Sequence, residues 1–289
     1  MISSRYTPFL LLGIAVALTT LQLRLVWNTG QLKGLEPYIL CYTTVYFMVW
    51  RKRNSLKLEC ASWRRFKPIA IANSIGLISV LWVLYRSTLI SSYDSALRFS
   101  PIISGLGLVF IGFGFSGLKS CWRELLVLSF LMIPTTTLIE LFDISHATAT
   151  LAGNFLWYSG FPVVQDGTKL VLPTGFVDVY VGCSGIQSIL QLLTLAFLFT
   201  MLFPMGWFQT LLIAIAAIAV AFLVNGVRVA LMAVLFAQAN ESAFDYWHVG
   251  DGSQLFSMVA VLLFGGVCYF CLERFDAEVD SQPTEQEGS

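Results

Sequence analysis

The stretch "WFQTLLIAIAAIAVAFLVNGVR", residues 207–228, decides the fold class. A helix needs about 20 apolar residues to cross the hydrocarbon core of a bilayer, and this stretch provides them in one run. Seven further apolar runs lie at 8–26, 35–50, 68–86, 101–118, 124–142, 184–203 and 253–272. The sequence therefore predicts an all-α polytopic membrane protein with about eight transmembrane helices.

The composition of the whole chain agrees with this fold class. Hydrophobic residues make up 57% of the 289 positions and charged residues only 12%, which is too little charge to cover a soluble domain of this size. We predict a single transmembrane domain over residues 1–275 and a disordered, acidic cytoplasmic tail over 276–289. The net charge of zero argues against nucleic acid as a partner.

The seventh apolar run continues beyond residue 228 to about Ala237. A helix rises about 1.5 Å per residue, so a helix of this length overshoots the bilayer. We therefore expect the helix either to break near Asn225-Gly226 or to protrude from the membrane.

Basic residues set the predicted orientation of the chain. Seven of the 17 lysines and arginines lie between residues 51 and 67, and loops rich in basic residues stay on the cytoplasmic side. Eight spans counted from this loop place the N- and C-termini in the cytoplasm.

Residues 143–182 are not membrane-like, because polar and charged side chains recur along them. Within this segment, β-branched residues flank an Asp166-Gly167 turn signal in "VVQDGTKLVLPTGFVDVYVG", residues 163–182. The pattern predicts a small extracytoplasmic β-hairpin that leads directly into Cys183.

Polar residues lie near that cysteine, at the start of the sixth apolar run. If the sixth helix includes Cys183, spacings of three and four residues place four polar side chains on one face. They are Cys183, Gln187, Gln191 and Thr194. A polar stripe of this kind faces protein or water rather than lipid.

Two later segments bring further polar groups to the same side of the membrane. Asn225 and Arg228 are three residues apart at the outer end of the seventh helix, so both side chains lie on the same face of that helix. The next outer loop, "ANESAFDYWHVGDGSQ" at 239–254, brings His248 to the head of the eighth helix. We therefore expect Cys183, Arg228 and His248 to converge at one membrane depth.

These three groups are suited to thiol-based acyl transfer. Only a few per cent of a free cysteine is thiolate at neutral pH, and a nearby guanidinium or imidazolium favours the charged form. Alternatively, Arg228 donates to the oxyanion of a tetrahedral intermediate, while His248 acts as general acid and then as general base. Unpaired backbone N–H groups at the start of the sixth helix are extra candidate oxyanion donors. The supporting residues are Ser184, Gly185, Gln187 and Asn225.

The sequence predicts no metal site and no cofactor. The six cysteines are scattered without the paired spacing of metal ligands. Cys268 and Cys271 have CxxC spacing, but they lie inside an apolar run with no second pair, and we interpret them as part of a buried helix face.

Three blocks of the sequence resemble the signature motifs of the exosortase/archaeosortase family. They are "LPTGFVDVYVGCSGIQSILQLL" (172–193), "LVNGVRVALMAVL" (223–235) and "WHVGDGSQLF" (247–256). The resemblance covers about residues 160–260 and suggests a cyanobacterial-type exosortase. It implies a membrane cysteine transpeptidase in which Cys183 is the nucleophile, while Arg228 and His248 complete a triad.

Members of that family are thought to cut C-terminal sorting signals from exported proteins. The resemblance implies membrane-anchored substrates that end in a short motif, a transmembrane helix and a basic tail. It further implies a thioester acyl-enzyme, a lipid or surface-glycan acceptor, and an active site on the extracytoplasmic side of the inner (cytoplasmic) membrane.

Two other functions stay open at this point. One is a rhomboid-like intramembrane serine protease that uses Ser184 and His248, although a serine–histidine dyad leaves no evident use for Arg228. The other is a non-catalytic transporter or assembly scaffold. Transporters usually place their ionisable groups near the bilayer midplane, whereas the polar groups of this chain gather at one face.

Overall fold

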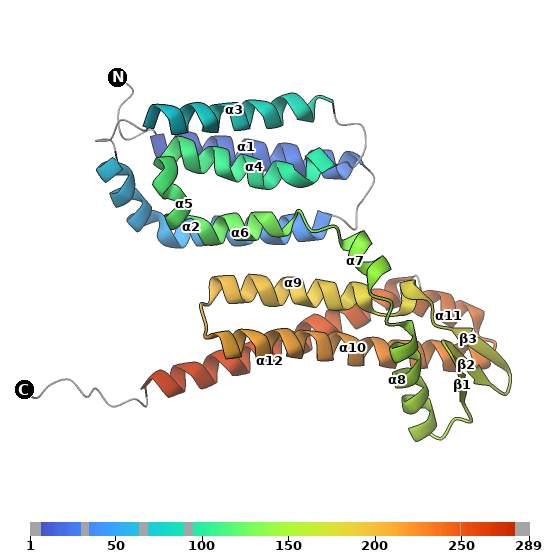
Figure 1. The fold of residues 1–289 in the computed structure, drawn as a ribbon. Helices are drawn as coiled ribbons and strands as arrows, with labels where there is room; N and C mark the ends of the chain where they lie inside the picture. The colour runs from blue at the N-terminus through green and yellow to red at the C-terminus, as the bar shows by residue number, and fades with distance from the viewer. Residues whose placement is uncertain (1–6, 30–34, 64–68, 90–94, 249, 281–289) are drawn as a thin grey trace, which may run out of the picture. The chain divides into compact units, whose positions relative to one another are not determined.

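The computed structural model describes residues 7–29, 35–63, 69–89, 95–248 and 250–280 (Figure 1). Contacts within the chain separate two compact units, Met1–Ile133 and Pro134–Ser289, whereas the sequence predicts one transmembrane domain over 1–275. Helices dominate both units.

The first unit is built from helices that meet through small residues. Its elements are α1 (Thr7–Asn28), α2 (Leu35–Trp63), α3 (Ile69–Ser87), α4 (Ser95–Phe113), η2 (Gly114–Ser116), α5 (Gly117–Ser120) and α6 (Trp122–Phe130). α3 packs along α4, where a Cβ atom added to Gly76 would lie 2.6 Å from the carbonyl oxygen of Gly107. Glycines therefore let these two backbones approach closely, as at many contacts between membrane helices.

A buried group of polar side chains joins three helices of this unit. Gln22 of α1 donates from Nε2 to the hydroxyl of Ser104 of α4 at 3.0 Å, and its Oε1 accepts from the hydroxyl of Tyr42 of α2. All three side chains are buried. Because buried polar groups need partners, these bonds favour one relative position of the three helices.

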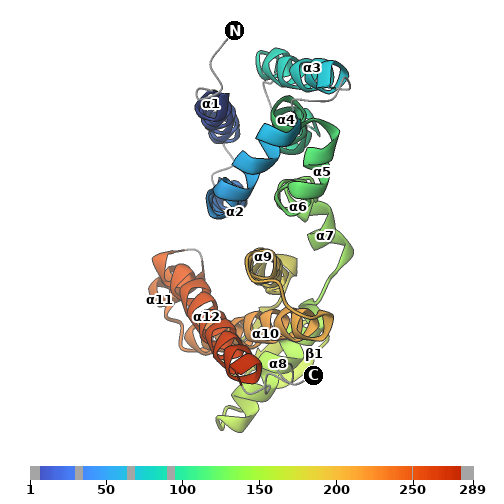
Figure 2. The same ribbon diagram turned by 90° about the vertical axis from the view of Figure 1, so that its left-hand side faces the viewer.

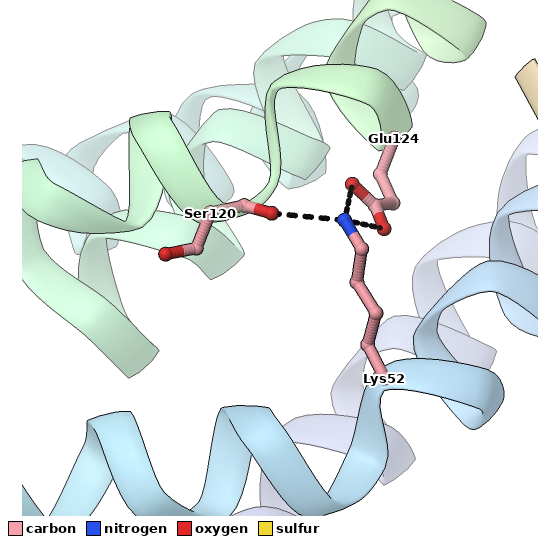
Figure 3. A network of polar contacts seen from close by, with 3 residues as sticks. All are labelled: Lys52, Ser120 and Glu124. Atoms are coloured by element: carbon pink, nitrogen blue, oxygen red, sulfur yellow. Dashed lines mark hydrogen bonds and ion pairs between the residues drawn. The ribbon is translucent and has the colours of Figure 1, made fainter. Parts of the chain in front are cut away.

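An ion pair joins α2 to α6 (Figure 3). The Nζ atom of Lys52 lies 2.9 Å and 3.3 Å from the two carboxylate oxygens of Glu124, and it donates to the carbonyl oxygen of Ser120 at 3.0 Å. The side chain of Glu124 is only 5% exposed. Lys52 thus supplies the charge compensation that a buried carboxylate needs.

The second unit combines helices with a small sheet. Its elements are α7 (Thr135–Leu141), α8 (Ser145–Tyr158), β1 (Val164–Asp166), β2 (Lys169–Leu172), β3 (Gly175–Asp178), η3 (Val181–Cys183), α9 (Ile186–Leu202), α10 (Trp207–Ala237), α11 (Glu241–His248) and α12 (Asp251–Asp280). α10 contacts α9, α12, α8 and β3 (Figures 1 and 2). It is therefore the central helix of this unit.

The segment before Cys183 forms a three-stranded antiparallel sheet in the order β1-β2-β3. The turn between β1 and β2 contains Gly167 at φ +63°, a backbone conformation that glycine adopts without steric cost. The sheet has one strand more than the predicted hairpin, and α8 precedes it. Leu170 and Leu172 point into the core, while the hydroxyl of Thr174 donates to the carbonyl oxygen of Ala237 at 2.7 Å and ties the sheet to the end of α10.

α10 runs without interruption through Asn225-Gly226, so the predicted break at this point is wrong. Gly226 is instead the place where α8 packs, because a Cβ atom there would lie 2.5 Å from Cδ2 of Leu151. A helix of 31 residues is about 46 Å long, which exceeds the roughly 30 Å of a bilayer core. The alternative expectation, a protruding helix, is the one compatible with this length.

The predicted span 124–142 is not one helix either. α6 ends at Phe130, a turn follows, and α7 begins at Thr135, directly after Pro134. Proline has no N–H group to donate and disfavours the helical conformation in the residue before it. Hydropathy alone does not detect this break, because the residues on both sides of it are apolar.

The ends of two other elements differ from the expectation. α2 continues to Trp63, well beyond the predicted span 35–50. α12 continues to Asp280, five residues into the tail predicted to be disordered, and residues 281–289 lie outside the described residues.

In the described part of the chain, five helical segments are long and apolar enough to cross a membrane. They are Phe9–Asn28, Ala70–Ser87, Ser95–Ser120, Trp207–Ala237 and Asp251–Glu273. α9 is apolar but shorter, with 17 residues. Large apolar side chains such as Phe9 and Leu262 are more than 70% exposed, which suits contact with lipid. The structure is that of a polytopic membrane protein.

We predict that Lys52→Met destabilises the first unit, because it leaves the buried carboxylate of Glu124 without a partner. The free energy of unfolding should fall by about 1–3 kcal/mol, measured by equilibrium SDS titration of the protein in mixed micelles. Lys119→Met is the matched control, since Lys119 is an exposed lysine of α5. Equal effects of the two substitutions would contradict the role of the ion pair.

Candidate active site

Cys183 lies in a tight turn between the sheet and α9. Its N–H group donates to the carbonyl oxygen of Tyr180 at 2.8 Å, and the N–H group of Ser184 donates to that of Val181 at 3.2 Å. These bonds form η3, a single 3-10 turn that ends at the cysteine. Cys183 therefore precedes α9 instead of belonging to it, and its side chain is buried.

Two side chains from neighbouring helices hold this turn by its carbonyl groups. Asn225 of α10 donates from Nδ2 to the carbonyl oxygen of Cys183 at 2.9 Å. Thr148 of α8 donates from its hydroxyl to the carbonyl oxygen of Ser184 at 2.6 Å. Both side chains are buried, so water does not compete for these bonds. The main chain on both sides of the thiol is consequently fixed from α10 and α8.

Gly185 is required at the start of α9 for two reasons. Its φ angle of +85° lies in the left-handed region, which side chains with a Cβ atom rarely adopt. In addition, a Cβ atom at this position would lie 2.6 Å from Cγ of Asn225. The sequence Cys-Ser-Gly is thus a turn in which the glycine leaves room for the amide that binds the cysteine carbonyl.

His248 approaches the thiol from the end of α11. Its Nε2 atom lies 3.5 Å from Sγ of Cys183, a hydrogen-bonding distance for sulfur. The imidazole lies against the ring of Phe244, one turn earlier on α11, with 5.1 Å between ring centres. This contact restricts the imidazole while leaving Nε2 directed at the cysteine.

Arg228 holds His248 through the main chain. Its guanidinium donates from Nη2 to the carbonyl oxygen of His248 at 2.8 Å. The buried Nε atom of Arg228 makes no hydrogen bond to the described residues. Arg228 follows Asn225 by three positions on α10, so one helix binds the main chain of both the thiol residue and the imidazole residue.

Tyr180 lines the same cavity as Cys183. A side-chain hydrogen bond with Cys183 raises the pKa of Tyr180, repulsion from a charged Cys183 and burial raise it further, and the charge of Arg228 lowers it. The phenol therefore stays protonated at neutral pH and can donate. Its ring lies over Gly182, where a Cβ atom would come within 2.5 Å of the ring carbon Cε2.

A cavity of about 170 Å³ opens beside the thiol. β3 and the residues after it form one wall, and α10 and α11 contribute the other wall. Cys183 and His248 both line it, so a molecule in this cavity has direct access to the sulfur and to the imidazole.

The predicted triad residues Cys183, Arg228 and His248 lie together in the structure, and Asn225 lies next to them. Two other expectations are wrong. Gln187 is exposed and does not share a face with the buried cysteine, because the left-handed turn at Gly185 separates Cys183 from α9. The N–H group of Ser184 is not a free oxyanion donor, because it is bonded within the turn.

Three neighbours of the site do not stand out in the sequence. Thr148, Tyr180 and Phe244 lie in segments whose polar or aromatic residues have no diagnostic spacing. Only the position of Tyr180, three residues before the cysteine, is a local signal. Among the described residues there is no cluster of three or more histidine, cysteine, aspartate or glutamate side chains that could hold a metal ion.

Comparison with known proteins adds a finding on the family. Residues 27–265 match the family model described as transmembrane exosortase (Exosortase_EpsH), a range that includes the whole site. No curated protein and no solved structure matches the chain.

We predict that Tyr180→Phe slows alkylation of Cys183 by iodoacetamide at pH 7 about two- to fivefold. Tyr180 is 57% exposed, so water screens its interaction with the sulfur, and we expect it to contribute about 0.5–1 kcal/mol, which corresponds to about a two- to fivefold change in rate. The rate is measured by mass spectrometry of the peptide that contains residue 183. Tyr158→Phe, at an exposed tyrosine of α8, is the control and should leave the rate unchanged.

Proposed function

The chain belongs to the transmembrane exosortase family, and we propose that it is a membrane cysteine transpeptidase with Cys183 as its nucleophile. Membership of this family suggests a membrane transpeptidase. The observation that carries the proposal is the 3.5 Å contact between Sγ of Cys183 and Nε2 of His248. A thiol beside an imidazole is the arrangement that activates cysteine for acyl transfer.

In the first half of the proposed reaction, His248 accepts the thiol proton on Nε2. The Cys183 thiolate attacks the carbonyl carbon of the scissile peptide bond and forms an S–C bond. The C–N bond breaks as the imidazolium gives its proton to the leaving nitrogen. The products are a thioester on Cys183 and the released C-terminal segment with a free amine.

In the second half, an acceptor amine or hydroxyl group occupies the place of the leaving amine. His248 takes the acceptor's proton, the acceptor attacks the thioester carbonyl, and the S–C bond breaks to restore the thiolate. Water in the same role gives hydrolysis. A lipid or a surface glycan is the acceptor that the family resemblance implies.

Besides the imidazolium of His248, Arg228 and Tyr180 are side chains of the site that can stabilise negative charge. A guanidinium combines a permanent charge with a planar set of donors, and only Nη2 of Arg228 is assigned to the His248 carbonyl. Its buried Nε has no partner among the described residues. We assign Arg228 two tasks: it holds His248 in place, and its charge stabilises the thiolate and the oxyanion.

We propose membrane-anchored exported proteins as substrates, each ending in a short motif, a transmembrane helix and a basic tail. The reaction then takes place on the extracytoplasmic side of the cytoplasmic membrane, with both termini inside. Support comes from the basic residues between positions 51 and 67, which favour the cytoplasmic side for this segment, and from the position of the thiol beside the polar sheet segment.

The geometry favours cysteine over serine as the nucleophile. The hydroxyl of Ser184 is fully buried and donates to the carbonyl oxygen of Val181 at 2.8 Å, and the imidazole contacts Cys183 instead. A serine protease of the rhomboid type would need the imidazole to contact the hydroxyl of Ser184. A transporter or scaffold does not require a thiol, an imidazole and a guanidinium in such close proximity.

Cys183→Ala should abolish processing of a co-expressed exported protein that carries such a C-terminal signal, while Ser184→Ala should retain most of it. The readout is the size shift of the substrate on an immunoblot, with membrane levels of each variant as the control. Processing that survives Cys183→Ala but not Ser184→Ala would reverse the assignment.

Arg228→Lys should lose activity almost as severely as Arg228→Ala. The ammonium keeps the charge but cannot reproduce the planar donors, and loss of one oxyanion donor costs on the order of 10²–10³ in rate. Initial processing rates at equal membrane levels give the comparison. Arg24→Lys, at an exposed arginine of α1, should be silent. Near-normal turnover by Arg228→Ala would remove this residue from the mechanism.

A further inference from the structure

One wall of the cavity beside Cys183 is formed by five consecutive residues, 176–180. Side chains alternate between the two faces of a strand, and the burial along β3 follows this alternation, with exposed Phe176 and Asp178 next to half-buried Gly175 and Val177. A cavity that touches every residue in turn cannot lie over one face alone. It therefore runs along the edge of β3.

Among the described residues, that edge has no partner strand. β3 is the last strand in the order β1-β2-β3, so within the described residues only its β2 side is bonded. The N–H group of Val179 donates to the carbonyl oxygen of Thr168, and in an antiparallel pair every second residue bonds to the same neighbour. The N–H and C=O groups of Phe176 and Asp178 consequently point away from β2, toward the free edge.

The opposite wall is apolar. Val229, Met232 and Phe236 line the cavity from one face of α10, and Phe244 and His248 line it from α11. The volume of about 170 Å³ is close to the roughly 150 Å³ of an engineered apolar cavity that binds benzene. The space thus fits one apolar side chain.

We propose that the substrate binds as an extended peptide that adds a fourth strand to the free edge of β3, with one apolar side chain in this cavity. This inference rests on the proposed function, because the apolar residue is the one whose carbonyl Cys183 attacks. Addition of a strand to a sheet edge gives affinity through the main chain and specificity through alternate side chains. Asp178 is the acidic residue at the cavity, and its charge disfavours an acidic substrate side chain.

The probes for the test are N-acetyl-tripeptidyl fluoromethyl ketones that end in leucine, alanine or aspartate. The thiolate of Cys183 displaces fluoride from their terminal carbon and forms a thioether, which mass spectrometry of the full chain in detergent micelles detects. The leucine probe should react about ten- to a hundredfold faster than the aspartate probe, as expected for burying one large apolar side chain. N-methylation of the probe amides that pair with β3 should slow labelling by about tenfold.

Met232→Trp fills the cavity and should abolish the preference for leucine. Val227→Trp is the matched control, because Val227 lies on α10 with an exposed side chain outside the cavity. The far-UV circular dichroism of both variants in detergent micelles should match that of the natural sequence, which shows that the helices are intact.

Equal labelling by the three probes, or a leucine preference that survives Met232→Trp, would overturn the inference and leave Cys183 as the nucleophile. Undiminished substrate processing by Cys183→Ala would instead overturn the proposed function. The two failures are therefore distinguishable.

Discussion

The hydrogen bond from the amide of Asn225 to the carbonyl oxygen of Cys183 is the contact on which the rest of the site depends. It joins α10 to the turn that carries the thiol, and it does so in a buried place where water cannot replace it. One helical turn later, Arg228 binds the carbonyl oxygen of His248. Cys183 and His248, the proposed nucleophile and base, are thus both positioned through their main chains from one helix, while their side chains face each other.

This arrangement explains several residue types around the thiol. Gly185 leaves room for the Asn225 amide, and Thr148 binds the next carbonyl group from α8. α8 reaches this place because Gly226, adjacent to Asn225, presents no side chain where the two helices cross. The pair Asn225-Gly226, interpreted from the sequence as a weak point of the helix, is therefore the junction of α8, α10 and the turn that carries Cys183.

The membrane class, most apolar helices and the convergence of Cys183, Arg228 and His248 follow from hydropathy and spacing. The errors arise where one residue overrides the pattern of its neighbours. Pro134 interrupts an apolar run, and the left-handed Gly185 ends the periodicity that would place Gln187 beside the thiol. Contacts between distant segments, such as that of Thr148 with the turn, leave no periodic signal in the sequence and could not be predicted.

Because α10 is uninterrupted, it also fixes the distance between residues of the site along its axis. Arg228 and Phe236 are eight residues apart on this helix, a distance of about 12 Å along its axis, and an extended peptide covers that distance in about four residues. If the proposed extended substrate runs along α10, the helical rise of α10 then sets how many of its residues meet this face. Inserting one residue between these two positions would rotate the cavity wall by about 100° relative to the guanidinium. A change in the number of peptide residues that the site accepts would therefore have to come from the sheet and not from α10.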